Sequence, residues 1–280
     1  MSAFNLKSYL HTCGQLTGEA LHRFLPSEEV PPCVLHQAMR YSVFAGGKRI
    51  RPAFVLATAD CLGLPHGGAI HAAAAIEMLH TYTLIHDDLP CMDDDDFRRG
   101  RPSCHKQFGE ANALLAGDAL LTLAFETAAS APAAPASLVR TLAAAAGSRG
   151  VVGGQVADLA AAGTPADVDT ILFIHEHKTA DLFRAAVEMG ALAAGATPDT
   201  LAALSRFGRA TGLAFQIVDD LLDAENPADT SFSCIHTLGI DSAKARAAEL
   251  TNEAMRALDG FGSSAEALRQ AARYLLERTT

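Results

Sequence analysis

The chain has 280 residues, of which 49% are hydrophobic, so it is long enough and apolar enough to bury a large core. Its net charge of −10 argues against a nucleic-acid-binding surface, which needs a basic field, so any phosphate chemistry must be local. Six cysteines without a close CxxC pair argue against a zinc site or a secreted disulfide framework, and no stretch approaches the roughly 18 apolar residues of a membrane span, so we expect a cytoplasmic protein.

Three long segments predict buried helices, around residues 69–89, 111–129 and 205–224. They combine strong helix formers with apolar residues three and four apart, and they are apolar over most of their circumference. The breaks between predicted helices, such as GLPHGG at 63–68, are short, and none is long enough for an interdomain linker. We therefore expect one all-α domain over residues 1–280, with central helices wrapped by others.

The first of these helices runs into an acidic cluster. The stretch HDDLPCMDDDDFRRGRP, residues 86–102, holds six aspartates and three arginines. Asp87 and Asp88 fall at the C-terminal end of the helix, where the macrodipole and the unpaired carbonyls already disfavour negative charge. Pro90 interrupts the helix and Asp93 follows, which gives the pattern DDxxxxD. Something must compensate this concentration of carboxylates.

A second acidic cluster, FQIVDDLLD, ends the third long helix. It places Asp219, Asp220 and Asp223 at positions i, i+1 and i+4 of an otherwise apolar segment. Asp219 and Asp223 then lie one above the other, about 6 Å apart along the helix axis. Carboxylates in such a place are unfavourable unless they are paired or bound to a metal.

A divalent metal accounts for both clusters. Mg²⁺ takes carboxylate oxygens, keeps several waters and shares its remaining positions with substrate phosphates. Two facing aspartate-rich helices would hold a diphosphate between them through bridging metals. The alternative is a solvated acidic face, but two clusters at the ends of apolar helices, one of them followed by Arg98 and Arg99, favour the metal.

These stretches resemble the motifs of the trans-isoprenyl diphosphate synthases, especially the bacterial farnesyl and geranylgeranyl diphosphate synthases. DDLPCMDDDDFRRG is similar to the first aspartate-rich motif of that family, and FQIVDDLLD is similar to the second. The resemblance runs from about residue 35 to 225 and resumes weakly afterwards. Three further matches follow in order and approximate spacing: GGKRIRP at 46–52, CHKQFGEANALLAGDAL at 104–120 and HKT at 177–179.

The resemblance implies a helical bundle of the isoprenoid-synthase type around an active-site cavity, a homodimer, and a magnesium-dependent prenyltransferase. The allylic C–O bond of dimethylallyl or geranyl diphosphate would ionise, the double bond of isopentenyl diphosphate would attack the carbocation, and a proton would leave. Such a reaction needs electrostatic stabilisation and positioning more than an activated nucleophile.

The resemblance also implies a role for individual residues. The ligands of three Mg²⁺ ions on the allylic diphosphate would be Asp87, Asp88, Asp93, Asp219 and Asp223, with Asp220 and Lys178 also in the catalytic set. Arg98 and Lys178 would hold the same diphosphate, with Thr179 and Gln216 nearby. Isopentenyl diphosphate would be bound by Lys48, Arg51, His80 and Arg99. Gln155 is expected to line the site, Asp94, Asp95 and Asp96 to be outer ligands or solvated, and His86, His105, His175 and His177 to be structural.

Two residues bear on the length of the product. Thr83 and Tyr82 precede Asp87 by four and five positions, on the helix face that the resemblance directs into the tunnel for the growing prenyl chain. A tyrosine there would act as a floor. The first aspartate-rich motif is also two residues longer than its short form. Together the two features favour a farnesyl synthase, which stops at fifteen carbons, over a geranylgeranyl synthase. The alternative is that Tyr82 is only a packed aromatic.

The sequence departs from the family after the second motif. Between Asp223 and Lys244 it has no lysine or arginine, where the family carries a basic loop over the allylic diphosphate, so the lid at about 224–243 is shortened. Three hypotheses follow: a working farnesyl synthase with a reduced lid, a geranylgeranyl synthase or one with a shifted allylic preference, and a non-catalytic or weakly active subunit that binds prenyl diphosphates. A terpene cyclase is disfavoured, because it would not need the four residues expected to bind isopentenyl diphosphate.

Overall fold

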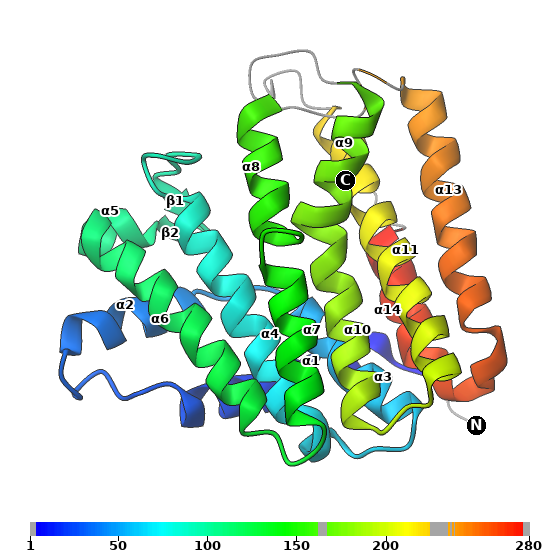
Figure 1. Cartoon of the computed structure of the whole chain (residues 1–280), viewed down its shortest axis with the longest axis horizontal. Helices are drawn as coiled ribbons and strands as arrows, with labels where there is room; N and C mark the ends of the chain where they lie inside the picture. The colour runs from blue at the N-terminus through cyan, green and yellow to red at the C-terminus, as the bar shows by residue number, and fades with distance from the viewer. Residues whose placement is uncertain (1–3, 162–166, 225–234, 236, 238, 277–280) are drawn as a thin grey trace.

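The computed structural model describes residues 4–161, 167–224, 235, 237 and 239–276. Within these ranges the chain is a bundle of helices with one short hairpin, in which Phe97–Arg98 (β1) pairs antiparallel with Arg101–Pro102 (β2) (Figure 1). The all-α prediction is confirmed, and the hairpin is an addition to it. None of the described helices is both long enough and apolar enough to cross a membrane.

Helices make up most of the chain that the structure describes. The first half of the chain forms α1 (Leu6–Phe24), α2 (Cys33–Val43), α3 (Ile50–Cys61), α4 (His66–Asp87), α5 (Cys104–Phe108), α6 (Glu110–Ala129) and α7 (Pro135–Ala146). The second half forms α8 (Val151–Ala161), α9 (Val168–Ile174), the π-helical turn η1 (His175–Ala180), α10 (Asp181–Ala193), α11 (Pro198–Asp223), α13 (Ile240–Ala257), the 3₁₀ turn η2 (Asp259–Ala265) and α14 (Glu266–Leu276).

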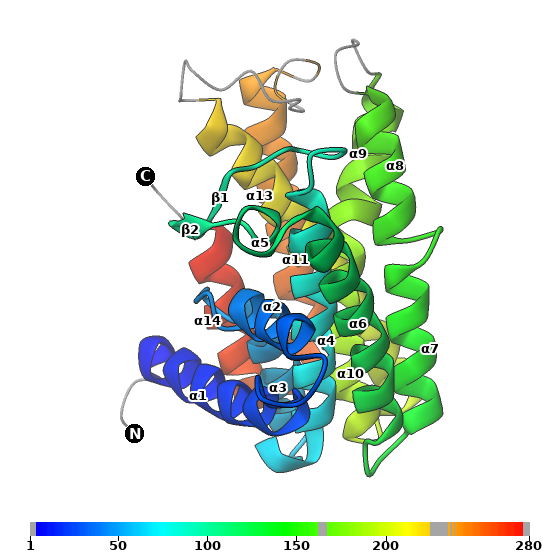
Figure 2. The same ribbon diagram turned by 90° about the vertical axis from the view of Figure 1, so that its left-hand side faces the viewer.

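Helix α4 is the central element. Its run from Ala72 to Leu79 is buried all round, because small and aliphatic residues let α3, α6 and α10 pack against different sides of it. Figure 2 shows α1 on one side of α4 and α7 and α10 on the other, and α2 packs against both α4 and α6. Beside it, the ring of Phe54 packs at 5.9 Å from the rings of Phe183 and Phe207, which joins α3 to α10 and α11. The predicted buried helix at 69–89 is confirmed.

The two helices that carry the acidic clusters end toward the same end of the bundle (Figure 1). Helix α4 ends at Asp87, and the N–H of Asp88 still donates to the carbonyl of Leu84. Helix α11 begins at the side-chain cap of Thr197, has Pro198 in its first turn and ends at Asp223. The fold therefore gathers both clusters at one end, as the sequence predicts.

Candidate active site

The first acidic cluster is folded back on the end of α4. The N–H of Asp93 donates to the carbonyl of Asp87 at 2.9 Å, so the loop returns to the helix end after Pro90. Burial raises the pKa of Asp87 to about 6, against the opposing effect of Lys178, and burial also raises the pKa of Asp88. The protein itself therefore compensates these carboxylates incompletely, and a hard divalent cation such as Mg²⁺ fits this set of oxygen donors.

Arg98 is tied to the same cluster. Its Nε donates to Asp88 at 2.8 Å, and its Nη2 donates to Asp88 and, at 2.7 Å, to Asp95. Asp88 is only 2% exposed, so this pairing holds a buried charge in place. Arg98 thus fixes the geometry of the first motif, and a diphosphate bound there would compete with Asp95 for it.

The second cluster is joined to η1 by a polar network. The amide of Gln216 donates to Asp220 at 3.0 Å and accepts from the hydroxyl of Thr179 at 2.8 Å. Asp220 is buried, and its second oxygen lies 3.3 Å from His175 Nε2. His175, which the sequence reasoning left as structural, is therefore a partner of the second motif. Of the other two aspartates, Asp219 is half-buried and Asp223 is exposed.

The π-helical turn η1 links the two clusters. Thr179 contacts the second cluster through Gln216, whereas the charge of Lys178 acts on Asp87 and Asp93 of the first. Lys178 also pairs with Asp158 of α8. Sequence reasoning missed Asp158, because it is a single aspartate in the segment GGQVADL with no acidic neighbour to mark it.

A basic cavity of about 300 Å³ lies beside the clusters. Lys48, Arg51, His80 and Arg99, the four residues expected to bind isopentenyl diphosphate, all line it. Gly47 has a φ of +110°, which other residues rarely adopt, and the guanidinium of Arg99 lies where a Cβ would be, 2.6 Å away, so glycine favours this loop conformation.

Two residues of the basic cavity have unusual electrostatics. Arg51 Nη1 lies 3.3 Å from His80 Nε2, and burial lowers the pKa of Arg51 to about 10. Burial, followed by the charges of Arg51 and Arg99, holds the pKa of His80 well below its usual range, so the imidazole is neutral. No motif indicated Glu77, which is 2% exposed and pairs with Arg49 in the wall of the cavity. With Glu77 already paired, the cavity keeps its positive field for an anion.

An apolar cavity of about 260 Å³ starts at Asp87. It is lined by Tyr82, Thr83, His86, Asp87, Met92, Val151, Val152, Gln155, Val156 and Leu159. The lining contains both residues predicted to set the chain length, and Gln155 as well. Tyr82 is 5% exposed and its ring packs edge-on against His86 at 5.4 Å. Met92 is a further lining residue that no motif indicated.

One predicted part of the site, the lid, lies largely outside the residues that the structure describes. The expected lid at 224–243 lies largely outside the described residues, which include from it only Ala224, Ile235, Thr237 and residues 239–243. The remaining expected site residues gather in three connected places: the two acidic clusters, the basic cavity and the apolar cavity. Such an arrangement can hold two anionic groups side by side with an apolar chain extending away from one of them.

Comparison with known proteins places this arrangement in a family. The model of the polyprenyl synthetase family matches residues 32–257. A chloroplastic geranylgeranyl pyrophosphate synthase of Capsicum annuum is 43% identical over 93% of this chain and 75% of its own length. The apo crystal structure of an FPP/GFPP synthase from Zymomonas mobilis superposes with a TM-score of 0.91 at 40% identity, over 97% of this chain and 99% of that one. A geranyltransferase from Legionella pneumophila gives 0.89 at 36% identity, over 98% of each chain. The chain therefore belongs to the polyprenyl synthetase family, the trans-prenyltransferases that act on isoprenyl diphosphates.

Proposed function

We propose that the protein condenses isopentenyl diphosphate with dimethylallyl or geranyl diphosphate to give farnesyl diphosphate and diphosphate. The observation that carries the proposal is the apolar cavity that starts at Asp87 and has Tyr82 in its wall. A prenyl chain whose diphosphate lies at the aspartates would extend into this cavity, and the buried phenol ring would limit its length.

The acidic clusters would hold the allylic diphosphate through Mg²⁺, which neutralises charge on the leaving diphosphate when it is bound. We assign Asp87, Asp88, Asp93, Asp219 and Asp223 as ligands of three ions, because they supply hard oxygen donors at one end of the bundle. Asp220 would position the second motif through Gln216 and His175. Lys178 and Arg98 would exchange their carboxylate partners, Asp158 and Asp95, for phosphate oxygens.

The basic cavity would take the diphosphate of isopentenyl diphosphate. Lys48, Arg51 and Arg99 supply the positive charge, and neutral His80 is held against Arg51. The substrate double bond would then face the allylic carbon, and the departing diphosphate would take the proton, so no protein base is required. Positioning and charge stabilisation together carry the reaction.

A geranylgeranyl synthase is the second candidate. It is favoured by the names of the curated relatives, since a heterodimeric geranylgeranyl pyrophosphate synthase large subunit of Arabidopsis thaliana is 41% identical over 94% of this chain. The difference between the two candidates is one further condensation, which depends on the space beyond Tyr82. A subunit that binds prenyl diphosphates without catalysis is the third candidate, motivated by the absence of lysine and arginine between Asp223 and Lys244.

One assay separates the three candidates. The purified protein is incubated with Mg²⁺, labelled isopentenyl diphosphate and, in turn, dimethylallyl, geranyl and farnesyl diphosphate, and the dephosphorylated products are separated by chain length. We expect a fifteen-carbon product from the first two substrates and little from the third. A twenty-carbon product would support the second candidate, and Mg²⁺-dependent binding without product would support the third.

We also propose that the protein is a homodimer. Exposed apolar side chains occur side by side on α6 and α8, namely Leu114, Leu115, Val152, Val156 and Leu159. The carbonyl of Leu114 lies 3.0 Å from His86 Nε2, and His86 lines the same cavity as the three residues of α8, so the two groups are neighbours. An apolar surface of this kind, continuous over two helices, is typical of an interface between subunits.

A further inference from the structure

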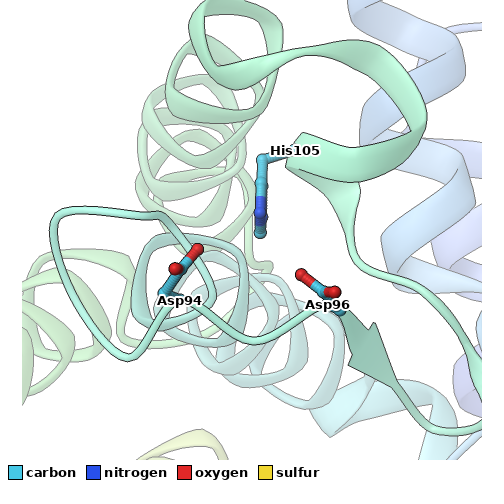
Figure 3. A group of neighbouring side chains, drawn as sticks. All are labelled: Asp94, Asp96 and His105. Carbon is cyan, nitrogen blue, oxygen red and sulfur yellow. The ribbon is translucent and has the colours of Figure 1, made fainter.

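A group of three side chains lies outside the three places described so far. Asp94 and Asp96 of the loop after α4 face His105 of α5, and the imidazole ring points into the space between the two carboxyl groups (Figure 3). One potential ligand atom from each residue lies within 4.8 Å of those of the other two. From the sequence, the aspartates are expected to lie behind the metal ligands or in solvent, and the histidine to be structural.

The four consecutive aspartates of this loop have different surroundings. Asp93 returns to the end of α4, and Asp95 pairs with Arg98 at 2.7 Å. One oxygen of Asp96 pairs with Lys106 at 2.6 Å, which leaves its second oxygen available. The side chain of Asp94 makes no hydrogen bond or ion pair with the part of the chain that the structure describes. Two carboxylate oxygens thus face the histidine without a direct partner.

His105 supplies an independent observation that points to a ligand. The residue is 6% exposed, and its Nδ1 lies 3.0 Å from the hydroxyl of Ser103, itself buried. Its Nε2 is buried and has no hydrogen-bond partner among the described residues. A buried polar atom left unpaired is unfavourable, so Nε2 is expected to have a partner that protein atoms do not provide. If Nδ1–H donates to Ser103, Nε2 presents a lone pair toward the aspartates.

The distances suit a cation between the groups better than direct contact. Neither carboxyl group comes within 4.0 Å of a nitrogen of His105, yet all three ligand atoms fall within 4.8 Å. Ligands that share one metal at about 2.0–2.2 Å lie about 3–4 Å from one another, so a small rotation of the two exposed aspartate side chains closes the gap.

We propose that Asp94, Asp96 and His105 bind a divalent cation of the Zn²⁺ type, at a site separate from the magnesium site of the catalytic aspartates. The imidazole nitrogen selects against Mg²⁺, which prefers oxygen alone, and in favour of borderline ions such as Zn²⁺. Three protein ligands leave the remaining positions to water. The cation would fasten the loop that carries Asp93 and Arg98 to α5, so it would act by positioning the first motif. This inference does not depend on which product the enzyme makes.

The test is a titration of the full-length protein with Zn²⁺ while Mg²⁺ is present in excess to occupy the catalytic aspartates. Thiolates bind Zn²⁺ tightly, so the background carries serine in place of Cys33, Cys91 and Cys234. Calorimetry measures affinity and stoichiometry, and X-ray absorption at the zinc edge reports whether an imidazole is bound. We expect one Zn²⁺ per chain with one imidazole ligand.

Two variants locate the site, and a third variant serves as the control. Asp94→Asn replaces an exposed side chain, leaves the fold intact and is expected to weaken Zn²⁺ binding at least tenfold. His105→Gln should remove the imidazole signal, while Glu126→Gln, an exposed change on α6, should leave the affinity unchanged. The proposal is overturned if Asp94→Asn binds Zn²⁺ as tightly as the parent, if excess Mg²⁺ displaces the Zn²⁺, or if the parent binds none.

Discussion

Arg51 fixes the protonation state of His80 within the basic cavity. A guanidinium can only donate, so His80 Nε2, 3.3 Å away, must accept, and the imidazole carries its proton on Nδ1 and no charge. Protonation of His80 would add a positive charge beside Arg51 and Arg99. Neutral His80 therefore holds Arg51 in place as a hydrogen-bond acceptor and adds no second positive charge beside it.

This arrangement predicts a pH dependence of stability. Because the folded-state pKa of His80 is lowered, the unfolded chain binds more protons than the folded chain below about pH 6.5. The contribution of His80 to stability is therefore complete above that pH and is lost as the pH falls. The loss is at most about 1.4 kcal/mol per pH unit. His80→Gln should lose less stability than wild type between about pH 7.5 and about pH 5.5 in urea unfolding. The exposed control His11→Gln should follow wild type, and equal slopes for all three proteins would refute this view of His80.

Tyr82 is the residue that should decide the product. Tyr82→Ala removes the ring from the wall of the apolar cavity, so we expect products at least five carbons longer, analysed by chromatography after dephosphorylation. Tyr82→Phe keeps the ring and should keep the wild-type distribution. If the alanine variant made the same products as wild type, the floor would have to be another lining residue, such as Met92.

At the level of elements, the approach of α8 to η1 depends on a single glycine. A Cβ on Gly154 would lie 2.3 Å from the backbone nitrogen of Lys178, and a backbone atom cannot swing aside as a side-chain end can. Alanine in the middle of a helix normally stabilises by about 0.5–1 kcal/mol relative to glycine. Here the overlap outweighs that gain, because overpacking costs about 1–3 kcal/mol.

Gly154→Ala should therefore destabilise the protein and, by displacing Lys178, lower kcat as well. Gly14→Ala in α1 is the matched control, since nothing lies within 4 Å of the added carbon, and it should raise stability and leave kcat unchanged. Thermal unfolding and steady-state kinetics measure both effects. A stabilised and fully active Gly154→Ala would show that α8 can shift freely against η1.

The spacing of residues along the sequence predicted the helices well, but it predicted contacts between distant side chains poorly. Helices α4, α6 and α11 follow from the spacing of apolar residues, and Pro90 marks the end of α4, but α11 begins at Pro198, seven residues before the predicted 205. The family motifs also marked Lys48, Arg51, His80 and Arg99, four of the residues that line the basic cavity. The partner of Lys178 could not be predicted, because Asp158 is twenty positions away and nothing in its neighbourhood is unusual. The same holds for His105, whose meeting with Asp94 depends on the path of the intervening loop.

At the scale of the molecule, charge is segregated. The chain carries −10 overall, yet the basic cavity gathers lysine, arginine and neutral histidine around one paired glutamate. The excess negative charge keeps other anions from the general surface, while the cavity attracts small anionic substrates locally. The charge balance of the whole chain therefore says little about the site, and only its distribution does.

The proposed homodimer gives a prediction at this scale. Leu115 is 54% exposed on α6, and Leu115→Glu would place a charge within the apolar surface, so we expect a dimer to become a monomer in size-exclusion chromatography with light scattering. Phe97→Glu is the control, because Phe97 is 68% exposed in the hairpin and belongs to neither α6 nor α8, so this change should not alter the mass. A wild-type monomer, or a variant that stays dimeric, would count against the interface.

The π-helical turn η1 inserts one extra residue into the continuous helical segment from Val168 to Ala193, compared with a regular α-helix. Each residue inserted in a helix rotates everything beyond it by about 100°, so this turn sets the rotation of α10 relative to α9. Removing Glu176 would let this segment close into ordinary α-helix and gain backbone hydrogen bonds, at the loss of the ion pair between Glu176 and Arg209. The side chains of Lys178 and Thr179 would then no longer face α8 and α11 together. The shortened chain should be a well-folded but inactive protein, because its helix is regular but its Lys178 and Thr179 no longer contact both neighbouring helices.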